Sequence, residues 1–171
     1  MALRSSFATG STRMMGLVLA LWLSAYGDGH AQSLAPFQKL VGQWSGNGTI
    51  ELSNGTHEEI RCRAAYDVLE QQNNLQLNIR CASESYGFDL RASATYAAGA
   101  ITGTWSEASR NASGTISGKA DGDRFQVVAR GPAFTATLTV VTRGNRQSVT
   151  IQSQDDKTRV KGASIALQRG S

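Results

Sequence analysis

Histidine, proline and cysteine are scarce in this chain, with two of each in 171 residues. Two histidines leave little material for the His-based catalytic and metal-binding sites that many enzymes use. A hydrophobic share of 40% and a charged share of 18% exclude both a disordered polyelectrolyte and a polytopic membrane protein. Aromatic residues make up only 7% of the chain. We find no linker, low-complexity tract or internal repeat, so the length predicts a single domain.

The N-terminal segment has the pattern of a secretory signal peptide. Arg4 and Arg13 precede an apolar run over residues 14–25, and two small residues, Gly29 and Ala31, occupy the −3 and −1 positions of a cleavage site. The apolar run is too short for a transmembrane span, which needs about 20 apolar residues. An uncleaved membrane anchor is the alternative, and we expect cleavage after Ala31 instead.

Cleavage at this position would leave a signal peptide (residues 1–31) and an exported domain (residues 32–171) in the bacterial periplasm, without a transmembrane anchor. It would also lower the formal net charge from +4 to +3 by removing Arg4, Arg13 and Asp28. This mild charge, without any basic run, argues against nucleic acid as a partner. We expect a monomer.

The exported domain alternates between apolar and polar residues with a period of two, as half-buried strands do. From Trp44 to Leu52 the even positions are apolar or glycine and the odd positions are polar. About ten such segments, separated by turn signals such as Asn54-Gly55, predict an all-β antiparallel meander. Closure into an up-and-down barrel would remove the exposed strand edges. The one helical candidate is a short turn at residues 34–41, just before the first strand.

Cys62 and Cys81 fit one strand register. A hairpin that turns near residues 70–73 can place Val68 opposite Leu75 and Cys62 opposite Cys81, and a slip of one residue would break both pairings. Opposed residues have Cβ atoms about 4.5–5.5 Å apart, so a disulfide needs only a small further approach. Free buried thiols or an incomplete metal site are the alternatives. Because thiols of small exported domains usually pair, we predict a Cys62–Cys81 disulfide.

The start of the first strand resembles a known signature. A short helical turn followed by Gly42-Gln43-Trp44 is similar to the Gly-x-Trp motif of lipocalins and the wider calycin barrels. With Gly46 and Gly48, the pattern resembles exported bacterial lipocalin-like barrels and, more weakly, nitrobindin-like barrels. The resemblance implies a calycin-like barrel, and the lack of a helix after the barrel strands favours ten strands over eight.

The same resemblance implies that a basic residue near the last strand packs on Trp44. Arg169 has a suitable position, and Arg159 and Lys161 are alternatives.

Few residues could carry catalysis. His57 is the only histidine of the exported domain, and adjacent strand residues point to opposite faces, so His57 and Glu58 would not share a site. Haem binding of the nitrobindin kind needs a histidine near the C-terminal strands, where this chain has none. Glu107 lies beside Arg110 and fits a salt-bridged loop. We therefore expect a non-enzymatic protein with no catalytic residue, metal or cofactor.

The apolar face of the predicted barrel mixes large side chains with glycine and alanine. This mixture could leave a cavity for an apolar ligand or only ease strand coiling around a solid core. We expect a small hydrophobic or amphipathic ligand inside the barrel. The candidate ligand-binding residues are Trp44, Tyr66, Phe88, Tyr96 and Trp105.

Four arginines, Arg61, Arg63, Arg80 and Arg91, share the polar face of the cysteine-bearing strands and their neighbour. In the predicted register Arg63 stands opposite Arg80, a like-charge pair that is normally unfavourable. Nearby acidic residues and solvent could neutralise these arginines. The alternative is a patch that binds an anion or a partner, such as an envelope component.

A second function class stays open. Bacterial periplasmic metalloprotease inhibitors are similar in having a small barrel, a Gly-Gln-Trp-like first strand and one disulfide. This resemblance implies an envelope interaction protein or protease inhibitor that acts through its N-terminal segment, residues 32–37, and the barrel rim.

Overall fold

The protein is described by a computed structural model that covers residues 36–69, 73–132 and 134–170. The predicted signal peptide and its cleavage site lie outside the described residues. Within these ranges, no helix is long and apolar enough to cross a membrane. In chain order the elements are η1 (Pro36–Leu40), β1 (Gly42–Leu52), β2 (His57–Leu69), β3 (Asn74–Ala82), β4 (Gly87–Ala97), β5 (Ala100–Glu107), β6 (Ala112–Asp121), β7 (Arg124–Gly131), β8 (Phe134–Arg143), β9 (Arg146–Ser153) and β10 (Val160–Arg169).

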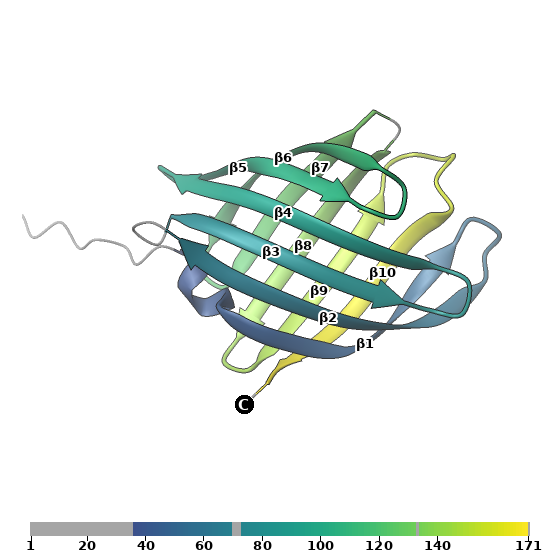
Figure 1. Ribbon diagram of the computed structural model, residues 1–171, viewed down its shortest axis with the longest axis horizontal. Helices are drawn as coiled ribbons and strands as arrows, with labels where there is room; N and C mark the ends of the chain where they lie inside the picture. The colour runs from purple at the N-terminus through teal and green to yellow at the C-terminus, as the bar shows by residue number, and fades with distance from the viewer. Residues whose placement is uncertain (1–35, 70–72, 133, 171) are drawn as a thin grey trace, which may run out of the picture. The chain divides into compact units, whose positions relative to one another are not determined.

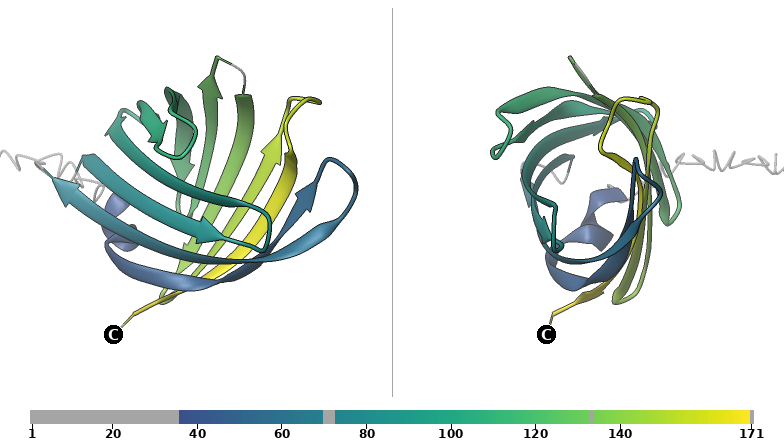
Figure 2. Two further views of the ribbon diagram at one scale, coloured as in Figure 1. Left: turned by 45° about the vertical axis from the view of Figure 1, so that its right-hand side comes forward. Right: turned by 90° about the vertical axis from the view of Figure 1, so that its right-hand side faces the viewer.

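The ten strands form one closed antiparallel barrel (Figure 1). Each strand pairs with the next in sequence, and β1 pairs with β10 to close the ring, as the two turned views show (Figure 2). The prediction of an all-β, up-and-down barrel of about ten strands is confirmed. The helical candidate at residues 34–41 is a single 3-10 helix, η1, over Pro36–Leu40.

The predicted register of β2 and β3 is also confirmed. Val68 pairs with Leu75, and Cys62 pairs with Cys81. The two cysteines form a disulfide, with their Cα atoms 4.1 Å apart. Both cysteines face the barrel interior and are almost fully buried.

Helix η1 closes one end of the barrel, which we call the floor (Figure 2). Phe37 and Leu40 are buried at this end, and the Phe37 ring stacks on Phe125 with 6.1 Å between ring centroids. The Lys39 ammonium forms an ion pair of 2.7 Å with Asp123 in the turn between β6 and β7. The short helix is therefore fixed to the opposite side of the barrel by both an apolar and a charged contact.

The Gly-x-Trp tryptophan is part of the floor. The Trp44 indole N–H donates to the Leu40 carbonyl at 2.7 Å. The Arg169 guanidinium carbon lies 4.6 Å from the centre of the Trp44 ring, and its Nη2 donates to the Lys39 carbonyl. Arg159 and Lys161 instead bond to Ser85 and to carbonyls of the loop before β10. The basic residue on Trp44 is Arg169.

The inward glycines mark close approaches between strands. A Cβ atom added to Gly103 would lie 2.1 Å from the Ser93 carbonyl oxygen, and one added to Gly118 would lie 2.2 Å from the Gln126 carbonyl oxygen. Any side chain at these positions would force neighbouring strands apart. The glycines thus permit the coiling of the strands, and their number says nothing about an empty interior.

Candidate functional site

The inner wall of the barrel is less completely buried than an ordinary apolar core. Many of its large apolar side chains point inward and are nevertheless partly exposed to solvent. They come from β3, β4 and β6–β9 and are Leu77, Ile79, Phe88, Leu90, Ile116, Val127, Leu138, Val140 and Ile151.

Leu138 shows where this solvent comes from. It lies in the middle of β8 and pairs with Val127 of β7 on one side and with Ile151 of β9 on the other. Paired strands flank it on both sides, and the sheet itself covers it from outside. We infer from this arrangement that solvent reaches Leu138 from inside the barrel. We call the space bounded by these partly exposed inward side chains the lumen.

The floor of the lumen includes a buried polar group of three residues. The Tyr66 hydroxyl donates to the Gln147 side-chain oxygen at 2.8 Å, and the Gln147 amide donates to the Thr142 hydroxyl at 3.0 Å. Burial raises the pKa of Tyr66 above its ordinary value, and the hydrogen bond to Gln147 offsets this only in part. Tyr66 is therefore a neutral phenol over the physiological pH range.

The end of the barrel opposite the floor, which we call the mouth, has Trp105 on its inner side. The Trp105 indole lies against Gly131, where an added Cβ would come within 2.9 Å of the ring, and it packs edge-on against Phe134. Its N–H points to the Arg130 carbonyl at 3.3 Å. Trp105 is buried by these contacts and narrows the mouth on the side of β5–β8.

Glu107, at the end of β5, organises the loop between β5 and β6. Its carboxylate accepts backbone N–H groups of Asp89, Ser109 and Arg110 at 3.0, 3.2 and 2.8 Å, and the Ser109 hydroxyl at 2.5 Å. Burial by itself raises the pKa of Glu107, but these hydrogen bonds outweigh it and lower the pKa to about 2. Arg110 adds an ion pair at 3.5 Å, so the expected salt bridge is present.

The remaining rim of the mouth is held by side-chain contacts between loops. The Arg110 guanidinium lies 4.4 Å from the centre of the Tyr86 ring. Glu58 faces inward at the start of β2 and accepts the hydroxyls of Ser83 and Ser85. These hydrogen bonds lower the pKa of Glu58. Between the mouth carboxylates and Arg169 at the floor, the inward positions of the described strands carry no charged side chain.

The five predicted ligand-binding residues all face inward but lie at different depths. Trp44 and Tyr66 are buried in the floor, and Tyr96 packs edge-on against Phe37 there. Phe88 is partly exposed in the lumen, next to the disulfide through its pairing with Cys81. Trp105 is buried at the mouth. The structure thus divides these residues between the two ends of the lumen and leaves the middle to aliphatic side chains.

Sequence reasoning missed those aliphatic side chains of the second half of the barrel. Adjacent valines, Val127-Val128 and Val140-Val141, make both faces of β7 and β8 apolar, so alternation does not reveal which face is inward. The pairing of Val127 with Gly118 and Leu138 identifies the inward member of the first pair. Only the pairing register with the neighbouring strands shows which valine faces inward.

His57 and Glu58 lie on opposite faces of the barrel wall, as expected. His57 is exposed on the outer face, paired with Glu51, whereas Glu58 faces inward. Among these residues there is no group of three or more His, Cys, Asp or Glu side chains able to hold a metal ion.

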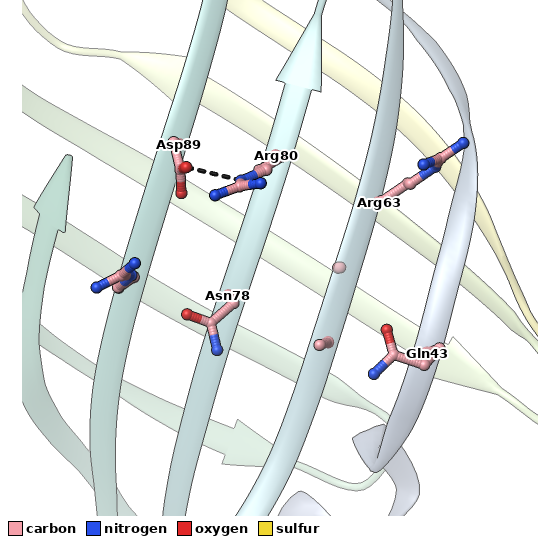
Figure 3. A pocket seen from close by; sticks show the side chains of 8 residues that line it. Gln43, Arg63, Asn78, Arg80 and Asp89 are labelled. Carbon is pink, nitrogen blue, oxygen red and sulfur yellow. Dashed lines mark hydrogen bonds and ion pairs between the residues drawn. The ribbon is translucent and has the colours of Figure 1, made fainter. Parts of the chain in front are cut away.

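The four predicted arginines lie together on the outer wall of β2–β4. Arg63 pairs with Arg80, as expected, and Arg80 forms an ion pair of 2.7 Å with Asp89. Arg63, Arg80 and Arg91 border a hollow of about 320 Å³ in this wall (Figure 3). Arg61 is exposed one step along β2 from Arg63 and is not part of the hollow.

Comparison with known proteins identifies structures with a similar fold but does not assign the chain to a sequence family. No protein-family model and no curated protein sequence matches the chain. The crystal structure of Rv2717c from M. tuberculosis is similar, with a TM-score of 0.65 and 13% sequence identity over 82% of this chain and 99% of that chain. The S-type phycobiliprotein lyase CPES from Guillardia theta is similar with a TM-score of 0.56 and 11% identity, over 79% and 90% of the two chains. Both are ten-stranded antiparallel barrels of the calycin, lipocalin-like type.

Proposed function

We propose that this protein is a non-enzymatic periplasmic barrel that binds a small hydrophobic or amphipathic molecule in its lumen. The observation that carries the proposal is the partial exposure of large inward apolar side chains in the middle of paired strands, as at Leu138. A ligand that covers these side chains removes apolar surface from water, which contributes roughly 25 cal/mol per Å². The fold, which is compatible with ligand binding, supports the proposal.

The polarity of the lumen defines the class of ligand. Its middle is aliphatic, and the carboxylates of Glu58 and Glu107 at the mouth are already engaged by hydroxyl and N–H donors. Burying a charge without a partner is costly, so the inserted part of the ligand should be uncharged. A polar end would lie at the mouth. In this arrangement Phe88 contacts the ligand directly, Trp105 supports the wall of the mouth from behind, and Trp44, Tyr66 and Tyr96 form the base of the lumen.

The Cys62–Cys81 disulfide supports the periplasmic part of this proposal, because structural disulfides persist in oxidising compartments. It is consistent with export, which the N-terminal sequence predicts. The inhibitor alternative has less support. Phe37, at the end of the segment that would act on a protease, is 1% exposed and packed in the floor, and residues 32–35 lie outside the described residues.

A binding experiment with an uncharged fluorescent dye tests the proposal. Nile red should give saturable, blue-shifted emission with the wild-type protein. Leu138→Trp fills the lumen from the middle of β8 and should weaken dye binding at least tenfold. Thr139→Trp adds the same group at the next residue, which faces outward, and should change binding less than twofold.

Urea unfolding of both variants separates binding from stability, because overpacking alone costs about 1–3 kcal/mol. Equal dye binding by wild type and Leu138→Trp, with both folded, would refute the lumen as the binding site. If the proposal holds, native mass spectrometry of protein purified from the periplasm should reveal the natural ligand as a bound small molecule.

A further inference from the structure

The outer wall of β1–β4 has a hollow whose chemistry differs from that of the lumen (Figure 3). Ala65 of β2 lies at its centre, paired with Gln43 on β1 and with Asn78 on β3. The longer side chains on the neighbouring strands stand around this small residue. The hollow therefore arises because a short side chain is surrounded by longer ones. The strands around it are regularly paired, so it is not a gap in the sheet.

Two of the three arginines at the hollow have no partner among the described residues. Arg80 is neutralised by Asp89. Arg63 and Arg91 form no ion pair or side-chain hydrogen bond within the described part of the chain, and both are exposed. The hollow thus carries two uncompensated positive charges. Arg63 stands opposite Arg80 of β3, and like charges on adjacent strands are destabilising, so an anion at the hollow would relieve this repulsion.

Arg63 and Arg91 stand on β2 and β4, on either side of β3, which carries Asn78. Figure 3 shows Arg80 turned toward Asp89 on β4, while Arg63 extends the other way, over β1. The Gln43 and Asn78 side chains lie farther along the same wall, on β1 and β3, and neither amide is engaged by another described side chain. Each amide offers N–H donors toward the space above Ala65.

We propose that this hollow binds a phosphate group, with the exposed Arg63 side chain turning back from β1 to reach it together with Arg91, and with the side-chain amides of Gln43 and Asn78 as additional donors. A phosphate monoester carries a charge of about −1.5 to −2 near neutral pH, which matches the two unpaired guanidinium groups. The planar guanidinium fork also binds phosphate oxygens in a bidentate manner. The site lies on the opposite side of the barrel wall from the lumen and does not depend on the proposed lumen ligand.

The first probe is inorganic phosphate. Its binding is monitored by two-dimensional ¹H–¹⁵N NMR, with a chloride titration at the same ionic strength as the control. Saturable shifts should be confined to the amides around Ala65 and Asn78. Arg63→Gln and Arg91→Gln should each weaken phosphate binding at least fivefold. Arg146→Gln removes the same charge from an exposed arginine of β9 without a described side-chain partner, and should change binding less than twofold.

Unsaturable or dispersed shifts, or equal weakening by all three variants, would overturn the proposal, because either result indicates general charge attraction. Arg63→Lys keeps the charge and loses the fork, so it should bind phosphate more weakly than wild type and more tightly than Arg63→Gln. Matching urea midpoints show that the variants are folded. Because the site is exposed, added salt should also weaken binding.

Vesicles distinguish the source of the phosphate group. The protein is sedimented with vesicles of phosphatidylglycerol and phosphatidylcholine, 3:1, and with phosphatidylcholine alone. Sedimentation that requires phosphatidylglycerol and is lost in Arg63→Gln identifies a lipid headgroup. Binding of free phosphate without sedimentation identifies a phosphate ester in solution. Both outcomes support a phosphate site. If neither is observed, the phosphate proposal fails and the lumen proposal is unaffected.

Discussion

At the end that η1 closes, the inward side chains are buried among one another, whereas from the middle of the barrel to the mouth many inward apolar side chains are partly exposed. Phe37, Trp44 and Phe125 are 1%, 2% and 4% exposed. Leu138 and Val127, on the same kind of strand and with the same inward direction, are not fully covered. One continuous sheet therefore provides both a packed region and the partly exposed region that we propose as the binding site.

Part of the mouth half is also packed, because Ile50, Leu52 and Ile60 of β1 and β2 are at most 5% exposed, but only the floor is packed by more than the sheet. There η1 adds side chains from outside the sheet, and Arg169 covers Trp44 from the last strand. The lumen has no comparable insertion among the described residues, and its partly exposed wall is formed by β3, β4 and β6–β9. Mutations in the two regions should therefore affect different properties, stability at the floor and binding in the lumen.

The largest expected effect is that of Trp44→Ala. Truncating a buried aromatic side chain costs about 3–5 kcal/mol, and this one also removes the hydrogen bond to Leu40. Leu138→Ala is the corresponding truncation in the lumen and should cost less than the roughly 2–5 kcal/mol of a fully buried leucine, because Leu138 is partly exposed. Urea unfolding measures both. Similar losses at the two positions would abolish the distinction between floor and lumen.

The disulfide should contribute nearly as much as the floor tryptophan. Cys62 and Cys81 are separated by 19 residues, and closing a loop of this size stabilises by about 3 kcal/mol. The double variant Cys62→Ala/Cys81→Ala should lose that amount and keep the barrel, since β2 and β3 remain paired. The intact mass of the wild-type protein should be lower than the reduced formula by two hydrogen atoms. An unchanged unfolding midpoint in the double variant would contradict this prediction.

A smaller effect is expected at the mouth, where the hydrogen bonds to Glu107 stabilise the loop between β5 and β6. Its pKa in the folded protein, about 2, lies below its ordinary value of 4.5. The stabilisation is therefore complete above pH 4.5 and disappears as the pH falls toward 2, with a size on the order of 2–3 kcal/mol. Unfolding measured between pH 6 and pH 2.5 should show this loss.

Glu107→Gln is the control for the acid effect. An amide cannot accept the same set of N–H and hydroxyl donors, so the variant should be less stable at pH 6 and lose less stability on acidification. Faster amide exchange at Ser109 and Arg110 should accompany the substitution. If wild type and variant lose stability equally between pH 4.5 and pH 2.5, the acid sensitivity arises elsewhere.

Much of the fold could be predicted from alternation and a few pairings. The register of β2 and β3 was recognisable because Val68, Leu75 and the two cysteines constrain the same hairpin. The contact of Arg169 with Trp44 followed from the resemblance to calycin barrels. Glu107 was recognised only as a partner of Arg110. The backbone donors that dominate its environment come from a strand 18 residues earlier and from the following loop, and no side-chain pattern indicates them.

The sequence by itself determined the strand order, the inward face of most strands, and the disulfide, because a period of two and a shared register are local properties of the chain. Only the tertiary structure decided how the mixture of large and small inward residues is used. The inward glycines accommodate close strand approaches, η1 fills the floor, and the middle of the barrel is left partly exposed. Space inside a closed barrel depends on the sum of side chains from ten strands and on what enters at the ends, and no single segment contains that information.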